Sequence, residues 1–87
     1  MALYGTGAAF AQDLDVRYPG YTGAMTVTSS NTAIATVSLD PSSTGNGPDS
    51  KFSITPVAVG SCTLTVSVNG NTVTVPVTVN STEITGQ

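Results

Sequence analysis

The stretch that decides the fold is CTLTVSVNGNTVTVPVTV, residues 62–79. Apolar and hydroxyl side chains alternate through residues 62–68 and again through residues 72–79. A period of two is typical of strands that bury one face and expose the other. Asn69-Gly70 lies between the two runs and suits a type I′ turn, because both central residues of that turn need a positive φ. The stretch therefore predicts an antiparallel hairpin whose second strand turns its four valines toward the core.

Outside the hairpin, shorter extended segments are separated by turn formers. We expect further strands at residues 10–17, 24–29, 34–38 and 52–54, and a long exposed loop at residues 40–50. No stretch has a helical period, and β-branched residues are frequent throughout. The pattern predicts an all-β protein, an antiparallel β-sandwich of about six or seven strands, with a barrel as the weaker alternative.

Length and composition limit the class of protein. The 87 residues suffice for one small domain, and we expect an N-terminal arm at residues 1–9, the sandwich at residues 10–80 and a tail at residues 81–87. Charged residues make up 8% of the chain, against about 25% in an average soluble protein. That share favours a protein of the cell exterior or of a large assembly over a cytosolic enzyme. The net charge of −3 excludes the basic patch that nucleic acid needs, and no apolar run reaches transmembrane length.

The N-terminal residues raise the question of a targeting signal. Ala8-Ala9-Phe10-Ala11 resembles a signal-peptidase site, but no basic residue precedes it and the stretch is too short and polar for a signal sequence. We therefore interpret residues 1–9 as a flexible arm on a chain that begins at its own Met1 and has no export signal.

Reactive side chains are scarce. The chain has no histidine, and its single cysteine, Cys62, follows the apolar register of a strand, so we expect a buried thiol, with an intermolecular disulfide as the alternative. Asp13 and Asp15 share one strand face, and Asp40 and Asp49 bracket the long loop. Calcium uses several such carboxylates, yet solvated carboxylates are the simpler interpretation. We predict no catalytic residue, no cofactor and no metal.

Contacts to a partner are expected at aromatic and apolar side chains. Leu3 and Tyr4 lie in the arm and are candidate anchors, since a tyrosine brings contact area at low entropic cost. Tyr18 and Tyr21 flank Pro19-Gly20, where they either cap one end of the sandwich or meet a partner surface.

Three segments together resemble bacterial and phage immunoglobulin-like domains. They are TSSN followed by IATV (residues 28–31 and 34–37), VGSCTLTV (residues 59–66), and the closing hairpin NGNTVTVPVTV (residues 69–79). The resemblance covers residues 10–80. It implies an immunoglobulin-like sandwich and a non-enzymatic role, because such domains are adhesive or spacing modules or decorate phage capsids and tails.

Two functions follow from this resemblance. The first is a virion structural protein, a small capsid or tail decoration that binds other virion subunits or copies of itself. The alternative is an adhesive, carbohydrate-binding or spacer module of a bacterial cell-surface or secreted protein, in contact with a host surface or a glycan. An enzyme is the least supported interpretation. Neither of the two favoured functions involves nucleic acid or a membrane.

Overall fold

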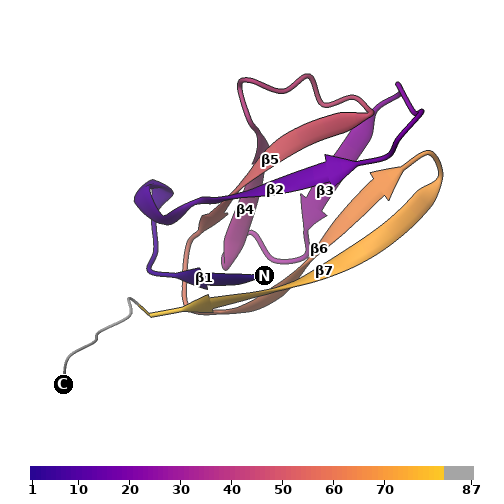
Figure 1. The fold of residues 1–87 in the computed structure, drawn as a ribbon. Coiled ribbons are helices and arrows are strands. Elements are labelled where there is room, and N and C mark those ends of the chain that lie inside the picture. The colour runs from indigo at the N-terminus through magenta and orange to yellow at the C-terminus, as the bar shows by residue number, and fades with distance from the viewer. Residues whose placement is uncertain (82–87) are drawn as a thin grey trace.

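The computed structural model describes residues 1–81 (Figure 1). A short 3-10 helix, η1 (Ala8–Phe10), accompanies the strands. The strands in this range are β1 (Ala2–Tyr4), β2 (Gln12–Arg17), β3 (Met25–Ser29), β4 (Ala35–Leu39), β5 (Asp49–Pro56), β6 (Gly60–Val68) and β7 (Asn71–Asn80). No helix among the described residues is long and apolar enough to cross a membrane.

The strands form two sheets packed face to face. One sheet has the order β1-β7-β6-β3 and the other β2-β5-β4, and every pairing is antiparallel except that of β1 with β7. Figure 1 shows the two layers, with β5 and β2 above β6 and β7. The predicted immunoglobulin-like β-sandwich is confirmed.

The hairpin of β6 and β7 has the predicted register. Val68 pairs with Asn71, and the ladder continues to the pair of Gly60 with Val79. Asn69 and Gly70 have φ values of 51° and 77°, which is the positive φ that a type I′ turn requires. The turn thus fixes which residues of β7 face the other sheet.

The core lies between the two sheets. It is made almost wholly of aliphatic side chains spaced two apart along the strands, as a half-buried sheet requires. The buried apolar residues are Leu3, Val16, Met25, Ala35, Phe52, Ile54, Cys62, Leu64, Val66, Val68, Val77 and Val79.

The predicted N-terminal arm is wrong. Residues 2–4 form β1, which pairs in parallel with Thr78–Asn80, and the Leu3 side chain is fully buried. The sequence pattern missed this strand because it is three residues long, carries a single inward side chain, and pairs with residues about 75 positions away. The division at residue 9 therefore does not exist in the fold. Of the predicted tail, residues 82–87 lie outside the described residues.

Two strand boundaries also differ from the expectation. Phe10 does not begin β2; it ends η1 and packs its ring against Gly5, where an added Cβ would come within 3.0 Å of the ring. The short strand expected at residues 52–54 is β5, which has eight residues, so the exposed loop ends at Pro48 rather than Ser50. In β5 every second side chain from Ser50 to Pro56 is buried, because that face of the strand packs against the other sheet.

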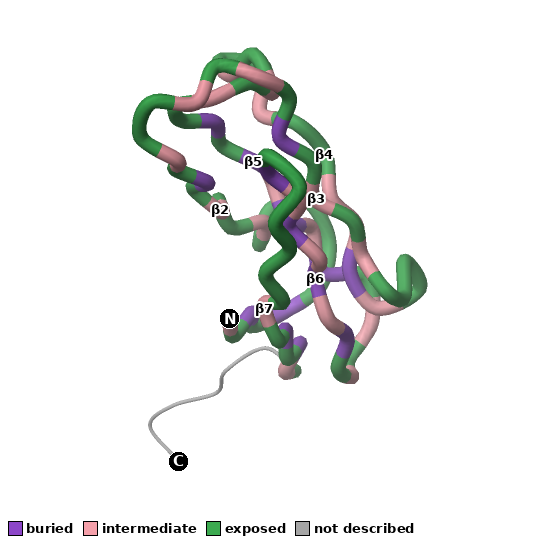
Figure 2. The backbone as a smooth tube through the Cα atoms, turned by 90° about the vertical axis from the view of Figure 1, so that its right-hand side faces the viewer, coloured by how far each residue is buried: buried purple, intermediate pink, exposed green. Residues whose placement is uncertain are grey.

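The four valines of β7 share one face but are not equally buried. Val77 and Val79 are each 1% exposed, Val75 is half-buried, and Val73 is 61% exposed. Figure 2 shows the hairpin end of β7 as a continuous exposed stretch. The prediction that all four valines reach the core is wrong at Val73, because alternation fixes the direction of a side chain and not what covers it.

Candidate functional site

The four predicted contact residues do not form one surface. Leu3 is in the core and is unavailable to a partner, whereas Tyr4 is 50% exposed beside it. Tyr4 pairs with Asn80 at one end of β7, while Tyr18 lies near Asn71 at the other end. Nine residues of extended chain separate these two ends, which is about 30 Å. A single partner patch containing all four residues is therefore excluded.

Tyr18 and Tyr21 pack against each other at the hairpin end of the sandwich. Their rings are 5.6 Å apart at 64°, an edge-to-face arrangement. The Tyr21 hydroxyl donates to the carbonyl of Ala24 at 3.1 Å, and Tyr21 lies so close to Gly23 and Gly47 that neither position has room for a Cβ. Both rings are half-buried, so the geometry gives this pair the capping role.

Two exposed carboxylates, Asp15 and Asp49, lie close together on neighbouring strands. Arg17 Nε lies 3.7 Å from Asp49 Oδ2 across β2 and β5. A hydrogen bond between the side chains of Asp15 and Asp49 raises the pKa of Asp15, since it is made only when a proton is shared. Among residues 1–81 no three cysteine or carboxylate side chains gather as metal ligands would.

Asp40 begins the loop that precedes β5. Its Oδ1 accepts hydrogen bonds from Ser42 N at 2.8 Å and Ser42 Oγ at 2.6 Å. These bonds to the ionised form lower the pKa of Asp40. The Asp40 carboxylate thus stabilises the turn at the start of its own loop, which accounts for an aspartate at this position.

Cys62 is buried, as predicted. Its Sγ accepts a weak hydrogen bond from Ser29 Oγ at 3.9 Å, across the β3–β6 pairing. The chain has no histidine, which is the usual base beside a cysteine nucleophile.

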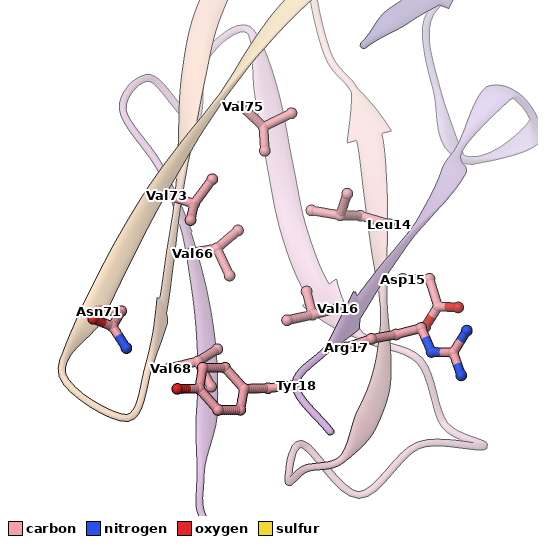
Figure 3. A pocket seen from close by; sticks show the side chains of 10 residues that line it. All are labelled: Leu14, Asp15, Val16, Arg17, Tyr18, Val66, Val68, Asn71, Val73 and Val75. Carbon is pink, nitrogen blue, oxygen red and sulfur yellow. The ribbon is translucent and has the colours of Figure 1, made fainter. Parts of the chain in front are cut away.

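An apolar groove between the sheets is the feature that sequence reasoning missed. It has a volume of about 270 Å³ and lies between β2 on one side and the hairpin of β6 and β7 on the other. In Figure 3, Leu14 and Val16 face Val66, Val73 and Val75 across the gap. Tyr18 and Asn71 line its hairpin end, whereas the side chains of Asp15 and Arg17 lie on the exposed face of β2 and point away from the gap (Figure 3). The inward side chains of the groove are mostly aliphatic, so its surface suits apolar groups.

The comparisons with known proteins bear on this fold. No family model matches the sequence, and no curated protein sequence matches it. Among solved structures, the chain is similar to domains 4 and 5 of the S-layer protein SbsC, with a TM-score of 0.72 and 26% identity. It is similar also to the structure of SbsC domains 1–6, with a TM-score of 0.76 and 28% identity, and to that of rSbsC(31-844), with a TM-score of 0.74 and 29% identity.

The match covers one domain of these larger proteins. It includes 92%, 95% and 91% of the present chain, but only 46%, 12% and 11% of the respective SbsC structures. The chain therefore spans less than half the length of each structure that it resembles.

Proposed function

We propose that the chain is a non-enzymatic structural module, a spacer or adhesive domain of a bacterial cell-surface or secreted protein. One observation carries the proposal: nearly the whole sandwich superimposes on S-layer protein domains, at TM-scores of 0.72 to 0.76 and identities of 26% to 29%. The resemblance of its sequence to bacterial immunoglobulin-like domains supports the same role.

The chemistry of the described residues supports this proposal. The cysteine is buried, Asp40 closes a turn and Asp49 pairs with Arg17 at the surface, which supports a role in rigidity and surface rather than in a reaction. An exterior location agrees with a surface rich in threonine and serine and poor in charge. The virion interpretation has no support among the similar structures.

Localisation tests the proposal directly. Antibodies raised against the recombinant chain are applied to intact cells of the source organism and to phage particles induced from the same culture. We expect labelling on the cell surface that brief protease treatment removes, while a cytosolic marker stays intact. Labelling of the phage particles alone would refute the proposal and restore the virion interpretation. Preincubation of the antibodies with the pure chain is the control for specificity.

A further inference from the structure

We propose that Asn69 is a site of covalent modification, at which the exposed turn between β6 and β7 converts its asparagine into aspartate and isoaspartate without an enzyme. This inference goes beyond the proposed function, since a spacer module needs no chemical change. It rests on a contrast within one molecule. The chain has two Asn-Gly dipeptides, Asn46-Gly47 and Asn69-Gly70, and the fold restrains only the first.

The reaction joins a backbone nitrogen to the asparagine side chain. The nitrogen of the following residue attacks Cγ and forms a C–N bond, and the side-chain amide leaves as ammonia, which takes up the backbone proton. Water then opens the succinimide ring at either carbonyl, which gives aspartate or isoaspartate. No electron is transferred, and water is the only co-reactant. Glycine favours the attack, because it has no Cβ to crowd the approach. Asn31, Asn71 and Asn80 precede threonine or serine, which do crowd it.

The Asn69-Gly70 dipeptide leaves this nitrogen accessible. Both residues are exposed at the tip of the hairpin (Figure 1), and apart from the chain neighbours no atom lies within 4 Å of a Cβ built at Gly70. Within residues 1–81, no acceptor receives a hydrogen bond from Gly70 N. Ring closure requires rotation about the Cα–C bond of Asn69. That rotation first disturbs the pair of Val68 with Asn71, where the ladder ends and local opening is easiest.

The Asn46-Gly47 dipeptide is held on both sides of the bond that must rotate. Gly47 N donates to Gly23 O at 2.9 Å, so the proton that must leave is already engaged by a carbonyl. The Asn46 carbonyl accepts a hydrogen bond from Ser50 Oγ at 2.7 Å, and Ser50 is 1% exposed. Rotation about the Cα–C bond of Asn46 therefore breaks two hydrogen bonds that have no counterpart at the hairpin tip.

The modification changes both the charge and the backbone of the turn. Residues 52–81 contain no charged side chain, so the product places the first carboxylate on the hairpin. Aspartate tolerates a positive φ as asparagine does, and Asn69 has a φ of 51°, so the aspartate form keeps the turn. Isoaspartate adds a methylene group to the backbone, which alters the geometry of a two-residue turn.

The test is a peptide map of the full chain, which has a single arginine and a single lysine. Trypsin cleaves after Arg17 and Lys51 and separates residues 18–51, which contain Asn46, from residues 52–87, which contain Asn69. The protein is incubated in mildly alkaline buffer, and mass spectrometry follows the mass gain at each asparagine. Digestion in water labelled with heavy oxygen identifies any conversion that occurs during the digestion itself.

We expect native Asn69 to convert at least about tenfold faster than native Asn46, the factor that two lost hydrogen bonds of ordinary net strength produce. In guanidinium chloride the two dipeptides should convert at similar rates, because the restraint is gone. Ser50→Ala removes the bond to the Asn46 carbonyl and should speed conversion at Asn46 but not at Asn69. Asn71 lies in the same tryptic peptide as Asn69 and should stay unchanged, which makes it the internal control.

Three outcomes would overturn the proposal. The first is a native Asn46 that converts as fast as Asn69 or faster. The second is a native Asn69 that stays intact while the denatured chain converts, which would mean that the turn protects it. The third is an unchanged ratio of the two rates in guanidinium chloride, which would assign the difference to flanking sequence. Each of these is read from the parent protein alone, whether or not Ser50→Ala folds.

Discussion

The two halves of the sandwich are built from the same residue types but differ in coverage. In the closed half, β1 lies along residues 78–80 of β7 and buries Leu3 against Val77 and Val79. In the open half, residues 71–75 of β7 continue the same alternation, no strand within residues 1–81 covers them, and Val73 is exposed. The comparison shows that the part of the long hairpin beside β1 is core, whereas the part without a neighbouring strand among the described residues is exposed.

The largest effect is expected from Leu3→Ala in the closed half. Leu3 is fully buried, and truncation of such a leucine costs about 2–5 kcal/mol in the free energy of unfolding. Urea unfolding checks this value. Tyr4→Ala, in the same strand but on its exposed face, serves as the control and should cost much less. Equal costs would mean that β1 is not part of the core.

The next effect compares valines on one face of β7. Val77→Ala should cost roughly 2 kcal/mol, because it removes buried methyl groups, whereas Val73→Ala should stay within about 0.5 kcal/mol. Val75→Ala should fall between them and lower the melting temperature more than Thr74→Ala, whose side chain faces solvent. Equal losses of unfolding free energy for the three valine variants would contradict the division into closed and open halves.

Thiol reactivity gives a kinetic version of the same comparison. Cys62 is buried between the sheets, so a thiol reagent should modify the native protein slowly and the denatured protein fast. In a Cys62→Ser background, Val73→Cys should react at least about a hundredfold faster than native Cys62, a factor equivalent to ~2.7 kcal/mol of local opening. Comparable native rates would show that the closed half opens as readily as the open half.

The smallest effect concerns the charged side chains on the exposed face of β2 and β5. The pKa of Asp15 lies above its ordinary value of 3.8 because Asp49 shares a proton with it, so the folded state binds that proton more tightly than the unfolded state. At a pH above the raised pKa, the two charged carboxylates therefore lower the free energy of unfolding. This free energy rises again as the pH falls through the raised pKa of Asp15 and the proton binds.

Asp49→Asn should bring the pKa of Asp15 down, as measured by NMR titration of the side-chain carboxyl. The pKa of Asp40 should stay below 3.8 in both proteins, since its lowering comes from Ser42, and it serves as the internal control. An unchanged Asp15 pKa would show that the two carboxylates do not interact.

The sequence predicted the parts of this fold that depend on local pattern. Alternation and Asn69-Gly70 define β6, β7 and their register, because turn geometry and a buried face act within a few residues. The burial of Cys62 followed from the same register. The strand β1 could not be predicted this way, since Ala2-Leu3-Tyr4 has one inward side chain and its partner lies at the far end of the chain.

The candidate site was less predictable than the fold. A pattern such as Val73-Thr74-Val75 states which side chains share a face, but the groove depends on which strands cover that face, and none within residues 1–81 does. The tyrosines were recognised as notable, yet their roles depend on distant residues: Gly47 makes room for Tyr21, and the carbonyl of Ala24 accepts its hydroxyl.

The parallel pairing of β1 with β7 also has a mechanical consequence. A force that draws residues 1 and 80 apart slides the two strands along each other, since both run in the same direction. The bonds of Met1 to Pro76, of Thr78 to Met1 and of Gly5 to Asn80 then carry the load at the same time rather than one after another. Tension along the chain is thus resisted in shear before it reaches the core.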